Sequence, residues 1–278
     1  MRFSLGFGAA ALAAGVALTG CQEAGTKYPP PSSCEGSMCG GTPPGGGVTG
    51  QDGGQGGGGT GGAGATIDQS GTVHRVVSPS FDDTVATPYG EAATIVFLPD
   101  SGTSTSASYG GGAGTTFSFT QIPSGRAWFF VQDDTAGAAQ VLSTFSYWQL
   151  PVLGTFSLPV IDLGTMQSIA ANLPTVAAKG GVLTNGAQII LKVVHATLPY
   201  KGVQVTGGSG GAQVAYDSGS GYSDTALATG AQGTIILFNS GLAGPSSITL
   251  TDTSTQMSYG VEVQASPGGA TILGVEIP

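Results

Sequence analysis

From about residue 67 to the C-terminus, the sequence repeats short runs of β-branched and aromatic residues, which are separated by clusters of Gly, Ser, Pro and Asp. Such runs at intervals of roughly 8–12 residues are typical of all-β sandwiches, because each run spans one strand and each cluster turns the chain back. The pattern therefore predicts an all-β fold. The expected strands cover residues 72–77, 93–98, 116–120, 127–132, 140–148, 188–194, 203–206, 213–216, 234–239, 247–251, 258–264 and 270–277.

An internal repeat predicts two domains. The stretch TTFSFTQIPSG (residues 115–125) is similar to GTIILFNSGLAG (residues 233–244), and each is an alternating strand that runs into a turn with Gly. The offset between them is close to the length of one sandwich, roughly 100 residues. We therefore expect two tandem β-sandwich domains, at residues 67–175 and 176–278. Core candidates are Val96, Phe117, Phe119, Ile122, Trp128 and Phe130 in the first, and Ile190, Val203, Val205, Ile235, Leu237, Ile248, Val261 and Val263 in the second.

One stretch, DLGTMQSIAANLP, has helical rather than strand periodicity. Leu163, Met166 and Ile169 fall on one face at a spacing of three residues. Asp162 is expected to cap this helix and Pro174 to stop it. We expect the helix to pack at the junction of the two domains.

Residues 1–20 have the layout of a secretory signal peptide. Arg2 precedes an apolar run from Phe3 to Leu18, and small residues follow. The run is shorter than the about 20 apolar residues that span a bilayer. The tetrapeptide LTGC at residues 18–21 resembles the lipobox of bacterial lipoproteins.

This resemblance implies that the thiol of Cys21 receives diacylglycerol and that Cys21 becomes the mature N-terminus. Two or more acyl chains hold a protein durably on a membrane, whereas a single chain binds marginally. The expected partner is therefore a membrane, through the lipid on Cys21. The same family knowledge implies, from Gln22, a location in the cell envelope at the outer membrane, either periplasmic or surface-exposed.

Residues 21–66 are expected to be a disordered tether. They contain YPPPSS, GGTPPGGG and GGQGGGGTGGAGA and show no helix or strand period. Too few apolar side chains are present to offset the entropy of ordering this segment. Cys34 and Cys39 are expected to form a disulfide, as thiol pairs in exported proteins usually do. A redox or metal site is the alternative, although a closed zinc site needs four ligands.

The charge balance limits the partners of the chain. Only 8% of the residues are charged, and 16 are acidic against 7 basic, for a net charge of −9. Nucleic-acid binding needs clustered Lys and Arg to displace counterions from phosphate, and the sequence has no such cluster. We therefore expect no nucleic-acid partner. A protein or a polysaccharide of the cell surface is the expected partner besides the membrane.

The stretch TFSFTQIPSGRAWFFVQD is similar to the carboxypeptidase regulatory-like, transthyretin-related β-sandwich family. That family shows an aromatic strand, a hydrophobic-Pro-x-Gly turn and a further strand, which match residues 117–119, 122–125 and 128–131. Its early G-V-x-V strand resembles residues 202–205. The resemblance implies tandem sandwiches of the immunoglobulin or transthyretin type, as in many bacterial surface lipoproteins.

Two candidate catalytic groups have no supporting context. Residues 207–211 read G-x-S-x-G around Ser209, but a nucleophile elbow needs a helix after it, and a strand, AQVAYD, follows here. We interpret the segment as a hairpin between two strands. His74 and His195 each lie alone on an expected strand, where a structural role is more common than a catalytic one. We expect no catalytic residues and no cofactor.

Acidic residues raise the question of calcium, which takes several hard oxygen ligands. None of them has the spacing of a known calcium loop, and Asp beside a turn is more often a turn former. We therefore expect no metal site, with calcium as the alternative. The candidates are Asp82, Asp83, Asp133, Asp134, Asp217 and Asp224.

Aromatic residues suggest a further alternative, a surface on which sugar rings stack. Trp148 ends an expected strand and is the candidate for exposure, although packing in a core or junction is the more common role. The sequence therefore favours a structural, adhesive or interaction role without catalysis. A carbohydrate-binding module is the alternative, and a hydrolase comes third. The aromatic candidates are Tyr89, Tyr147, Trp148, Tyr200, Tyr216 and Tyr222.

Overall fold

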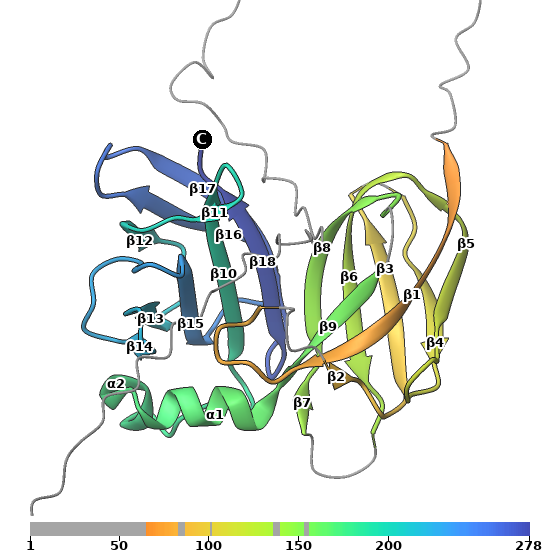
Figure 1. Cartoon of the computed structure of the whole chain (residues 1–278), viewed down its shortest axis with the longest axis horizontal. Helices are drawn as coiled ribbons and strands as arrows, with labels where there is room; N and C mark the ends of the chain where they lie inside the picture. Colours follow the sequence, from red (N-terminus) through yellow and green to blue (C-terminus); the bar gives the residue numbers. More distant parts are fainter. Residues whose placement is uncertain (1–64, 83–86, 101, 136–139, 153–155) are drawn as a thin grey trace, which may run out of the picture.

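The protein forms two β-sandwiches that lie side by side, as Figure 1 shows, and this confirms the predicted all-β fold. The signal peptide, most of the tether, Cys21, Cys34 and Cys39 lie outside the described residues. The predicted domain boundary between residues 175 and 176 stays a prediction. The computed structural model describes residues 65–82, 87–100, 102–135, 140–152 and 156–278.

The first sandwich contains the strands up to β9. One of its sheets runs in the order β4-β3-β6-β8, and the facing sheet has the order β2-β1-β9-β7, with β5 also paired to β1. The strands are β1 (Thr66–Val76), β2 (Thr87–Pro88), β3 (Ala93–Pro99), β4 (Thr105–Tyr109), β5 (Phe117–Pro123), β6 (Gly125–Asp133), β7 (Val141–Leu142), β8 (Thr144–Leu150) and β9 (Ser157–Asp162).

The second sandwich follows two helices, α1 (Leu163–Ala171) and α2 (Pro174–Ala177). One sheet runs in the order β14-β13-β15-β10-β18, with β11 paired to β10, and the facing sheet is β12-β16-β17. The strands are β10 (Ala187–His195), β11 (Leu198–Pro199), β12 (Val203–Gly207), β13 (Gln213–Asp217), β14 (Tyr222–Ser223), β15 (Thr234–Ser240), β16 (Gly244–Asp252), β17 (Ser258–Ala265) and β18 (Ala270–Glu276).

The two sandwiches share one sheet. The last strand, β18, pairs in parallel with β8, so that Ala270 lies opposite Thr144 and Ile272 lies opposite Ser146. This pairing joins strands of both sandwiches into a ten-stranded sheet. In Figure 1, β18 and β8 run together near the middle of the molecule and diverge toward the end where the C-terminus lies. The sandwiches are therefore joined by backbone hydrogen bonds as well as by side chains.

Aromatic rings fill the core of the first sandwich. Phe97, Phe117, Phe129 and Phe156 are each at most 2% exposed. The ring centroid of Phe129 lies 5.4 Å from that of Phe97 and 5.2 Å from that of Phe156, in tilted and edge-to-face arrangements. Such pairs add about 0.5–1.5 kcal/mol each beyond the burial of their area.

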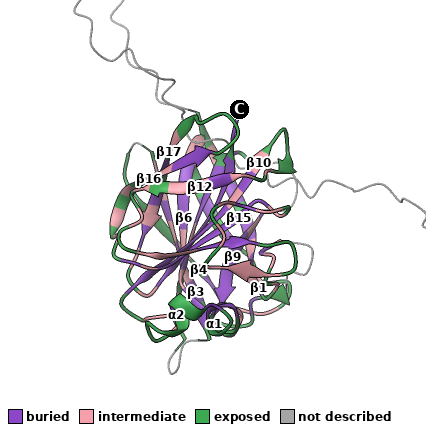
Figure 2. Cartoon of the chain, turned by 90° about the vertical axis from the view of Figure 1, so that its left-hand side faces the viewer, coloured by how far each residue is buried: buried purple, intermediate pink, exposed green. Residues whose placement is uncertain are grey.

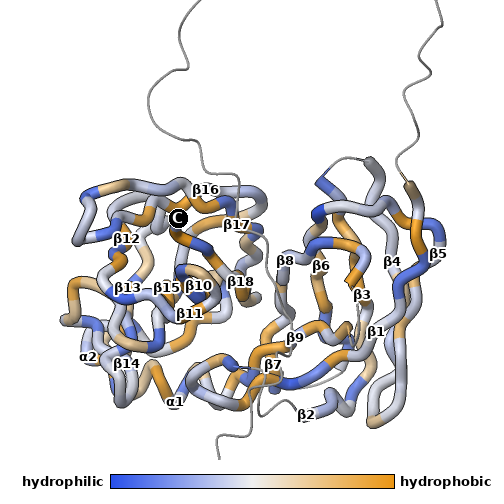
Figure 3. Tube along the Cα trace, turned by 45° about the horizontal axis from the view of Figure 1, so that its top comes forward, coloured by the Kyte–Doolittle hydropathy of each residue, from blue (hydrophilic) through white to orange (hydrophobic). Residues whose placement is uncertain are grey.

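Aliphatic side chains fill the core of the second sandwich. Ile189, Leu191, Ile235 and Leu237 from one sheet are fully buried. They pack in one cluster with the inward side chains of β16 and β17. Figure 2 shows the buried strands between partly exposed outer elements, and Figure 3 shows the same strands as the hydrophobic parts of the trace.

The predicted core of the first sandwich is partly wrong. Phe117, Phe119 and Ile122 are buried as expected, but Val96 and Phe130 are only half-buried. Their neighbours on β3 and β6 fill the core instead, because side chains alternate across a strand. The sheet that contains β3 and β6 is apolar on both faces, because its outer face meets the second sandwich. Its strands therefore lack the alternation of apolar and polar residues that would show which face is the core. The inward residues are Ile95, Phe97, Phe129 and Val131.

The predicted helix is confirmed as α1. Asp162 caps it, and its carboxylate accepts the N–H of Thr165 at 2.5 Å. Met166, Ile169 and Ala170 are buried against β10, β15 and β18 on the face of the sheet opposite the three-stranded sheet. Ile190, a predicted core residue, belongs to this cluster. Residues from the first sandwich also join it, so α1 packs at the junction as expected.

The same Asp162 binds Arg75 of β1. The Arg75 Nε donates to Asp162 Oδ2 at 2.7 Å, and a second guanidinium nitrogen contacts the same oxygen. Burial raises the pKa of the Asp162 carboxyl, but the bonds from Arg75 and Thr165 outweigh burial and hold that pKa below its ordinary value. One carboxylate thus caps the helix and ties it to the first sandwich.

Strand β1 begins earlier than predicted. Its first half, residues 66–71, pairs with β5, and its second half, residues 72–76, pairs with β9. The strand passes through Gly71, where a Cβ would lie 2.6 Å from the carbonyl oxygen of Phe156. β1 therefore changes its partner strand from β5 to β9 at Gly71.

The loop after β1, residues 77–82, crosses to the second sandwich, and we call it the crossing loop. The Tyr222 hydroxyl donates to the carbonyl of Pro79 at 2.7 Å, and Lys192 Nζ donates to the carbonyl of Ser80 at 2.6 Å. Both donors belong to the second sandwich, on β14 and β10. The crossing loop is thus a third tie between the sandwiches, beside the β8–β18 pairing and α1.

Removing the ring of Phe81 should loosen this tie. The side chain is 3% exposed, lies among the residues under α1 and has its ring 6.3 Å from that of Tyr222. Phe81→Ala should lower the free energy of unfolding by about 3 kcal/mol, because it opens a cavity at the junction. Chemical denaturation measures this, with Leu227→Ala as the control, since Leu227 is 82% exposed and its loss should cost less than about 0.5 kcal/mol. Equal effects from both variants would contradict the tie.

Candidate functional site

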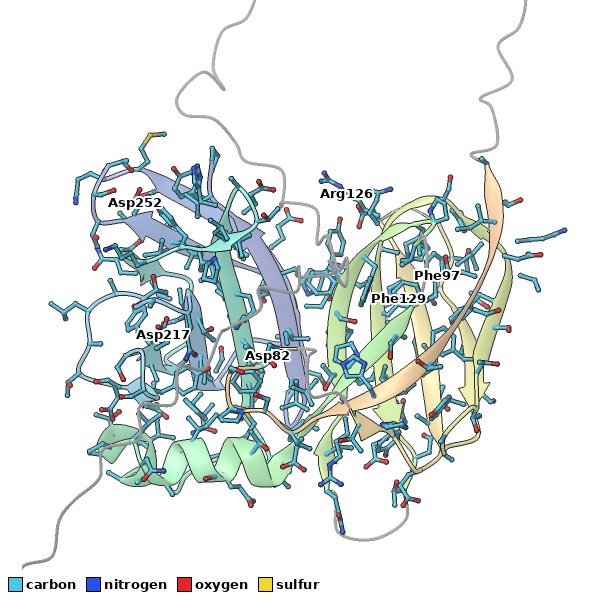
Figure 4. The ribbon with its side chains drawn as sticks, in the orientation of Figure 1. Asp82, Phe97, Arg126, Phe129, Asp217 and Asp252 are labelled. Carbon is cyan, nitrogen blue, oxygen red and sulfur yellow. The ribbon has the colours of Figure 1, made fainter. Side chains whose placement is uncertain are left out.

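Asp217 holds a loop further along the chain and not the turn that follows it, which corrects the predicted turn-forming role. Asp217 ends β13 and is fully buried. Its carboxylate accepts the backbone N–H groups of Gly230 (3.0 Å), Gln232 (2.9 Å) and Thr234 (2.9 Å). Charge-assisted bonds of this kind are about twice as strong as neutral ones. Asp217, labelled in Figure 4, therefore fixes the loop that leads into β15.

Asp252 does the same at the end of β16. It is 1% exposed and accepts bonds from the Tyr200 hydroxyl (3.0 Å), the Ser254 N–H (2.8 Å) and the Thr255 hydroxyl (2.9 Å). Burial raises the pKa of its carboxyl, but these donors outweigh burial and lower the pKa to about 2. No local pattern singles out Asp252, because its partners come from another loop and from its own turn.

The acidic pair Asp133 and Asp134 also serves the fold. Asp133 accepts the Tyr89 hydroxyl at 2.5 Å and the Thr135 N–H at 3.0 Å, and Asp134 accepts the Thr94 hydroxyl at 2.7 Å. Burial, together with the bond to Asp133, raises the pKa of Tyr89 to about 12. The two carboxylates therefore point to different partners and not to a shared ion.

The remaining described acidic candidates, Asp224 and Asp82, also accept hydrogen bonds from nearby residues. Asp224 accepts the N–H and the hydroxyl of Thr175, at 2.6 and 2.7 Å, and Asp82 accepts the hydroxyl of Ser80 at 2.5 Å. Asp83 lies outside the described residues. Within the parts of the chain that the structure describes, no group of three or more His, Cys, Asp or Glu side chains could hold a metal ion.

Ser209 lies in a tight crossover and not in a hairpin, which corrects our interpretation. The strand before it, β12, belongs to the three-stranded sheet, and the strand after it, β13, belongs to the ten-stranded sheet. Gly208 has a φ of +70°, and a Cβ there would lie 2.1 Å from the carbonyl oxygen of Ser247. Gly208 in this segment therefore serves close backbone packing, since only Gly fits this conformation and this space.

Ser209 and His195 lie far apart. The Ser240 hydroxyl donates to the carbonyl of Ser209 at 2.8 Å, and Ser240 pairs with Ala187 at the start of β10. His195 ends the same strand, which places it about 26 Å away at the usual rise per residue. Its Nδ1 lies 2.8 Å from the carbonyl oxygen of Ile277. The geometry therefore excludes a Ser209–His195 catalytic pair.

His74 is buried inside the first sandwich. It is 6% exposed, and its Nδ1 lies 2.8 Å from the hydroxyl of Ser157 on the neighbouring strand β9. The hydroxyl of Thr72 donates to the same Ser157 oxygen at 2.9 Å. This small network links β1 to β9, so the structural interpretation of His74 is confirmed.

The favoured packing of Trp148 in a core is confirmed, and the alternative of an exposed Trp148 is wrong. Trp148 is 4% exposed, its ring lies 5.0 Å from that of Phe156 in the first core, and its indole N–H donates to the Ser146 hydroxyl at 2.9 Å. Tyr89, Tyr147 and Tyr216 are also buried. The predicted aromatic candidates therefore do not form a surface for sugar stacking around Trp148.

Aromatic side chains line the junction of the sandwiches instead. Trp128 and Tyr147 project from the outer face of the first sandwich, and their ring centroids lie 4.9 Å apart. They pack in the core cluster of the second sandwich. The Tyr147 hydroxyl donates to Asp100 at 2.9 Å. Burial, then the bond to Asp100, raises the pKa of Tyr147, and the charge of Glu262 on β17 adds to this rise. Glu262 lies between Val261 and Val263 of β17, which pack in the same cluster as Trp128 and Tyr147.

One edge of the three-stranded sheet is closed by side chains. The N–H of Val203 on β12 donates to the Thr229 hydroxyl at 3.0 Å, and the N–H of Val205 donates to the Tyr216 hydroxyl at 2.9 Å. These donors would otherwise face outward from an edge strand. Such protection prevents pairing with a further strand.

The opposite edge, β17, is open. Among the described strands, β17 pairs only with β16. The N–H of Asp252 donates to the carbonyl of Met257 at 2.9 Å, and this bond shows which residues of β17 are hydrogen-bonded to β16. In an antiparallel pair, alternate residues turn their N–H and C=O groups away from the partner strand. Here those residues are Ser258, Gly260 and Glu262.

This open edge is the candidate functional site, and the sequence alone does not reveal it. The stretch SYGVEVQA predicts a strand, and the strand is confirmed as β17. Nothing in that stretch indicates whether the strand has one neighbour or two, because the neighbours are set by the topology of the whole sandwich. The sequence also does not reveal that Thr229 and Tyr216 cover the edge of β12, because both residues lie outside that strand, further along the chain.

Comparisons with known proteins do not assign a family. No family model matches the sequence, and no curated protein matches it. A solved streptococcal ancillary pilin is 11% identical over 76% of this chain and 68% of its own, with a TM-score of 0.22. The TIE protein of Bacillus anthracis is 9% identical, with a TM-score of 0.23, and this chain spans only 34% of that protein's length. These likenesses are too slight to carry an argument, and the resemblance to the carboxypeptidase regulatory-like family stays a prediction.

No helix among the described residues has the length and apolar character that crossing a membrane requires.

The low pKa of Asp252 predicts loss of stability in acid. Because the folded-state pKa of about 2 lies below the ordinary value of 3.8, the stabilisation is complete above about pH 4 and is lost as the pH falls toward 2. Asp252→Asn should lower the melting temperature at pH 7 and reduce the further drop between pH 4 and pH 2. Thermal melts monitored by circular dichroism measure both. Asp134→Asn is the matched control, and a drop in acid that Asp252→Asn leaves unchanged would contradict the assignment.

Proposed function

We propose that the chain is a non-catalytic, lipid-anchored protein of the cell envelope, in which two fused β-sandwiches bind another macromolecule. The observation that carries this proposal is the parallel pairing of β8 with β18, which makes one rigid body from two sandwiches. A rigid body with exposed loops and one open strand edge is suited to presenting a binding surface at a fixed geometry.

The use of the acidic side chains supports a role without catalysis. Asp162, Asp217 and Asp252 each accept several bonds that hold a helix, a loop or a turn. Catalytic carboxylates instead need a partner group across a cleft, and the separation of Ser209 from His195 removes the sequence's other catalytic candidate. Only 8% of the residues in the whole chain are charged.

A lipid on Cys21, the cysteine of the stretch that resembles a lipobox, would attach the protein to the membrane. The described N-terminal end of β1 and the C-terminus both lie at the end of the molecule away from α1 and α2 (Figure 1). A lipid on Cys21 would therefore be linked to the sandwiches through the chain that enters at that end, and the expected tether would leave their orientation free. A carbohydrate-binding module is the less favoured alternative, because it needs exposed aromatic rings and the candidates around Trp148 are buried.

Lipidation can be tested on the native protein. Mass spectrometry of the mature N-terminus should find a diacylated Cys21, and Cys21→Ala should move the protein from the membrane fraction to the soluble fraction. Two or three acyl chains supply essentially all of the expected membrane affinity, so the shift should be nearly complete. Cys34→Ala is the control and should stay in the membrane fraction. A native protein that retains Met1 would refute the anchor.

A further inference from the structure

We propose that the open edge of β17 binds an extended segment of a partner polypeptide as an added strand, with a basic side chain of that segment opposite Glu262. The inference rests on the proposed function, because it names the kind of partner that the rigid body would bind. Strand addition gives affinity through backbone hydrogen bonds and gives specificity through alternate side chains.

The other edges are less suitable. β12 is closed by Thr229 and Tyr216, and β4 and β5 contact each other along the far side of the first sandwich. The described strands β2, β7, β11 and β14 are two residues long each, too short to guide a partner. β17 has eight residues, and its outer edge carries no strand in the part of the chain that the structure describes.

The edge offers unpaired backbone groups. Ser258, Gly260 and Glu262 turn their N–H and C=O groups outward. A Cβ placed on Gly260 would meet only the Ser247 hydroxyl, at 3.8 Å, so the outer face of the sheet is uncrowded at this residue. The outward carbonyl of Gln264 is already bonded by the Thr271 hydroxyl, which closes the edge toward β18. The open length thus runs from the hairpin tip to about residue 263.

The inner side of an added strand would meet the junction. Val261 and Val263 point inward from β17 and pack in one cluster with Trp128 and Tyr147 of the first sandwich. Alternate side chains of the added strand would point to the same side, so apolar residues are favoured there. The open edge is therefore continuous with the interface between the sandwiches.

The outer side favours a basic partner. Glu262 is exposed on the outer face of β17, and the exposed Asp100 accepts the Tyr147 hydroxyl at the junction, against one half-buried cation, Arg126. Figure 4 places Arg126 beside the gap between the sandwiches. The whole chain carries a net charge of −9. Opposite charges on directly paired strands stabilise the pair, so Lys or Arg opposite Glu262 is expected.

Amide hydrogen exchange on the full chain in detergent micelles tests the edge. Without a partner, the amides of Gly260 and Glu262 should exchange at least about tenfold faster than those of Tyr259 and Val261, which bond to β16. The probe is the synthetic peptide TVTVKVT, which alternates apolar and polar residues around one Lys. Its addition should slow exchange at Gly260 and Glu262 at least tenfold. Exchange that the peptide leaves unchanged would overturn the proposal.

Charge reversal tests the pairing with Glu262. Glu262→Lys should weaken binding of TVTVKVT about tenfold and strengthen binding of TVTVEVT by a similar factor. Glu276→Lys is the matched control, because Glu276 is exposed at the end of β18 and carries the same charge. Equal effects from both variants would show only long-range attraction and would overturn the specific pairing.

Two other occupants are outcomes of the same experiment. Protection of Gly260 that rises with protein concentration, together with a dimer in light scattering, would mean that a second copy occupies the edge. If the Gly260 amide is protected at all protein concentrations and deletion of residues 22–64 removes this protection, the chain's own N-terminal segment occupies the edge. Either result overturns the proposal, whereas loss of acylation at Cys21 would instead overturn the proposed function and leave the edge intact.

Discussion

The parallel pairing of β8 with β18 is the interaction on which the rest of the structure depends. It makes two sandwiches into one body and turns the outer face of the first sandwich into an interior surface. Trp128 and Tyr147 can then be buried on that face, although their strands already bury Phe129 and Trp148 on the other. A sheet that is buried on both sides needs apolar residues throughout, and this explains why β3, β6 and β8 lack clean alternation. The helix α1 and the crossing loop add side-chain contacts around the same seam.

Few charges are present in this protein, and most of the described acidic ones are used in its architecture. Asp162 caps a helix, Asp217 gathers three backbone N–H groups, and Asp252 organises a hairpin end. A carboxylate that accepts several donors can hold a loop that has little apolar surface of its own. This arrangement suits a chain whose loops are rich in Gly, Ser and Thr. It also means that a change at these positions should be felt as lost stability and not as lost chemistry.

Much of the fold could be predicted from the sequence, because strand runs, turn clusters and the capped helix are local signals. The expected strands and α1 appear close to their predicted positions. The long-range features could not be predicted. Strand β9 is almost wholly buried yet contains Pro159, which argues against a strand in a single sequence. The segment around Ser209 looks like a hairpin, but its two strands belong to different sheets. The open edge of β17 depends on the absence of a neighbour, which no local pattern records.

The order of β18 in the sequence has a consequence for folding, because it follows all the other described strands. This strand lies between β10 and β8 in the finished sheet and pairs in parallel with both. Parallel pairing between distant segments forms slowly, because a long loop must close before any contact is gained. Until β18 is in place, β8 and β10 would each present an unpaired strand edge that could bind wrong partners. The two sandwiches can therefore become one body only after a strand that comes late in the sequence inserts between two strands that precede it.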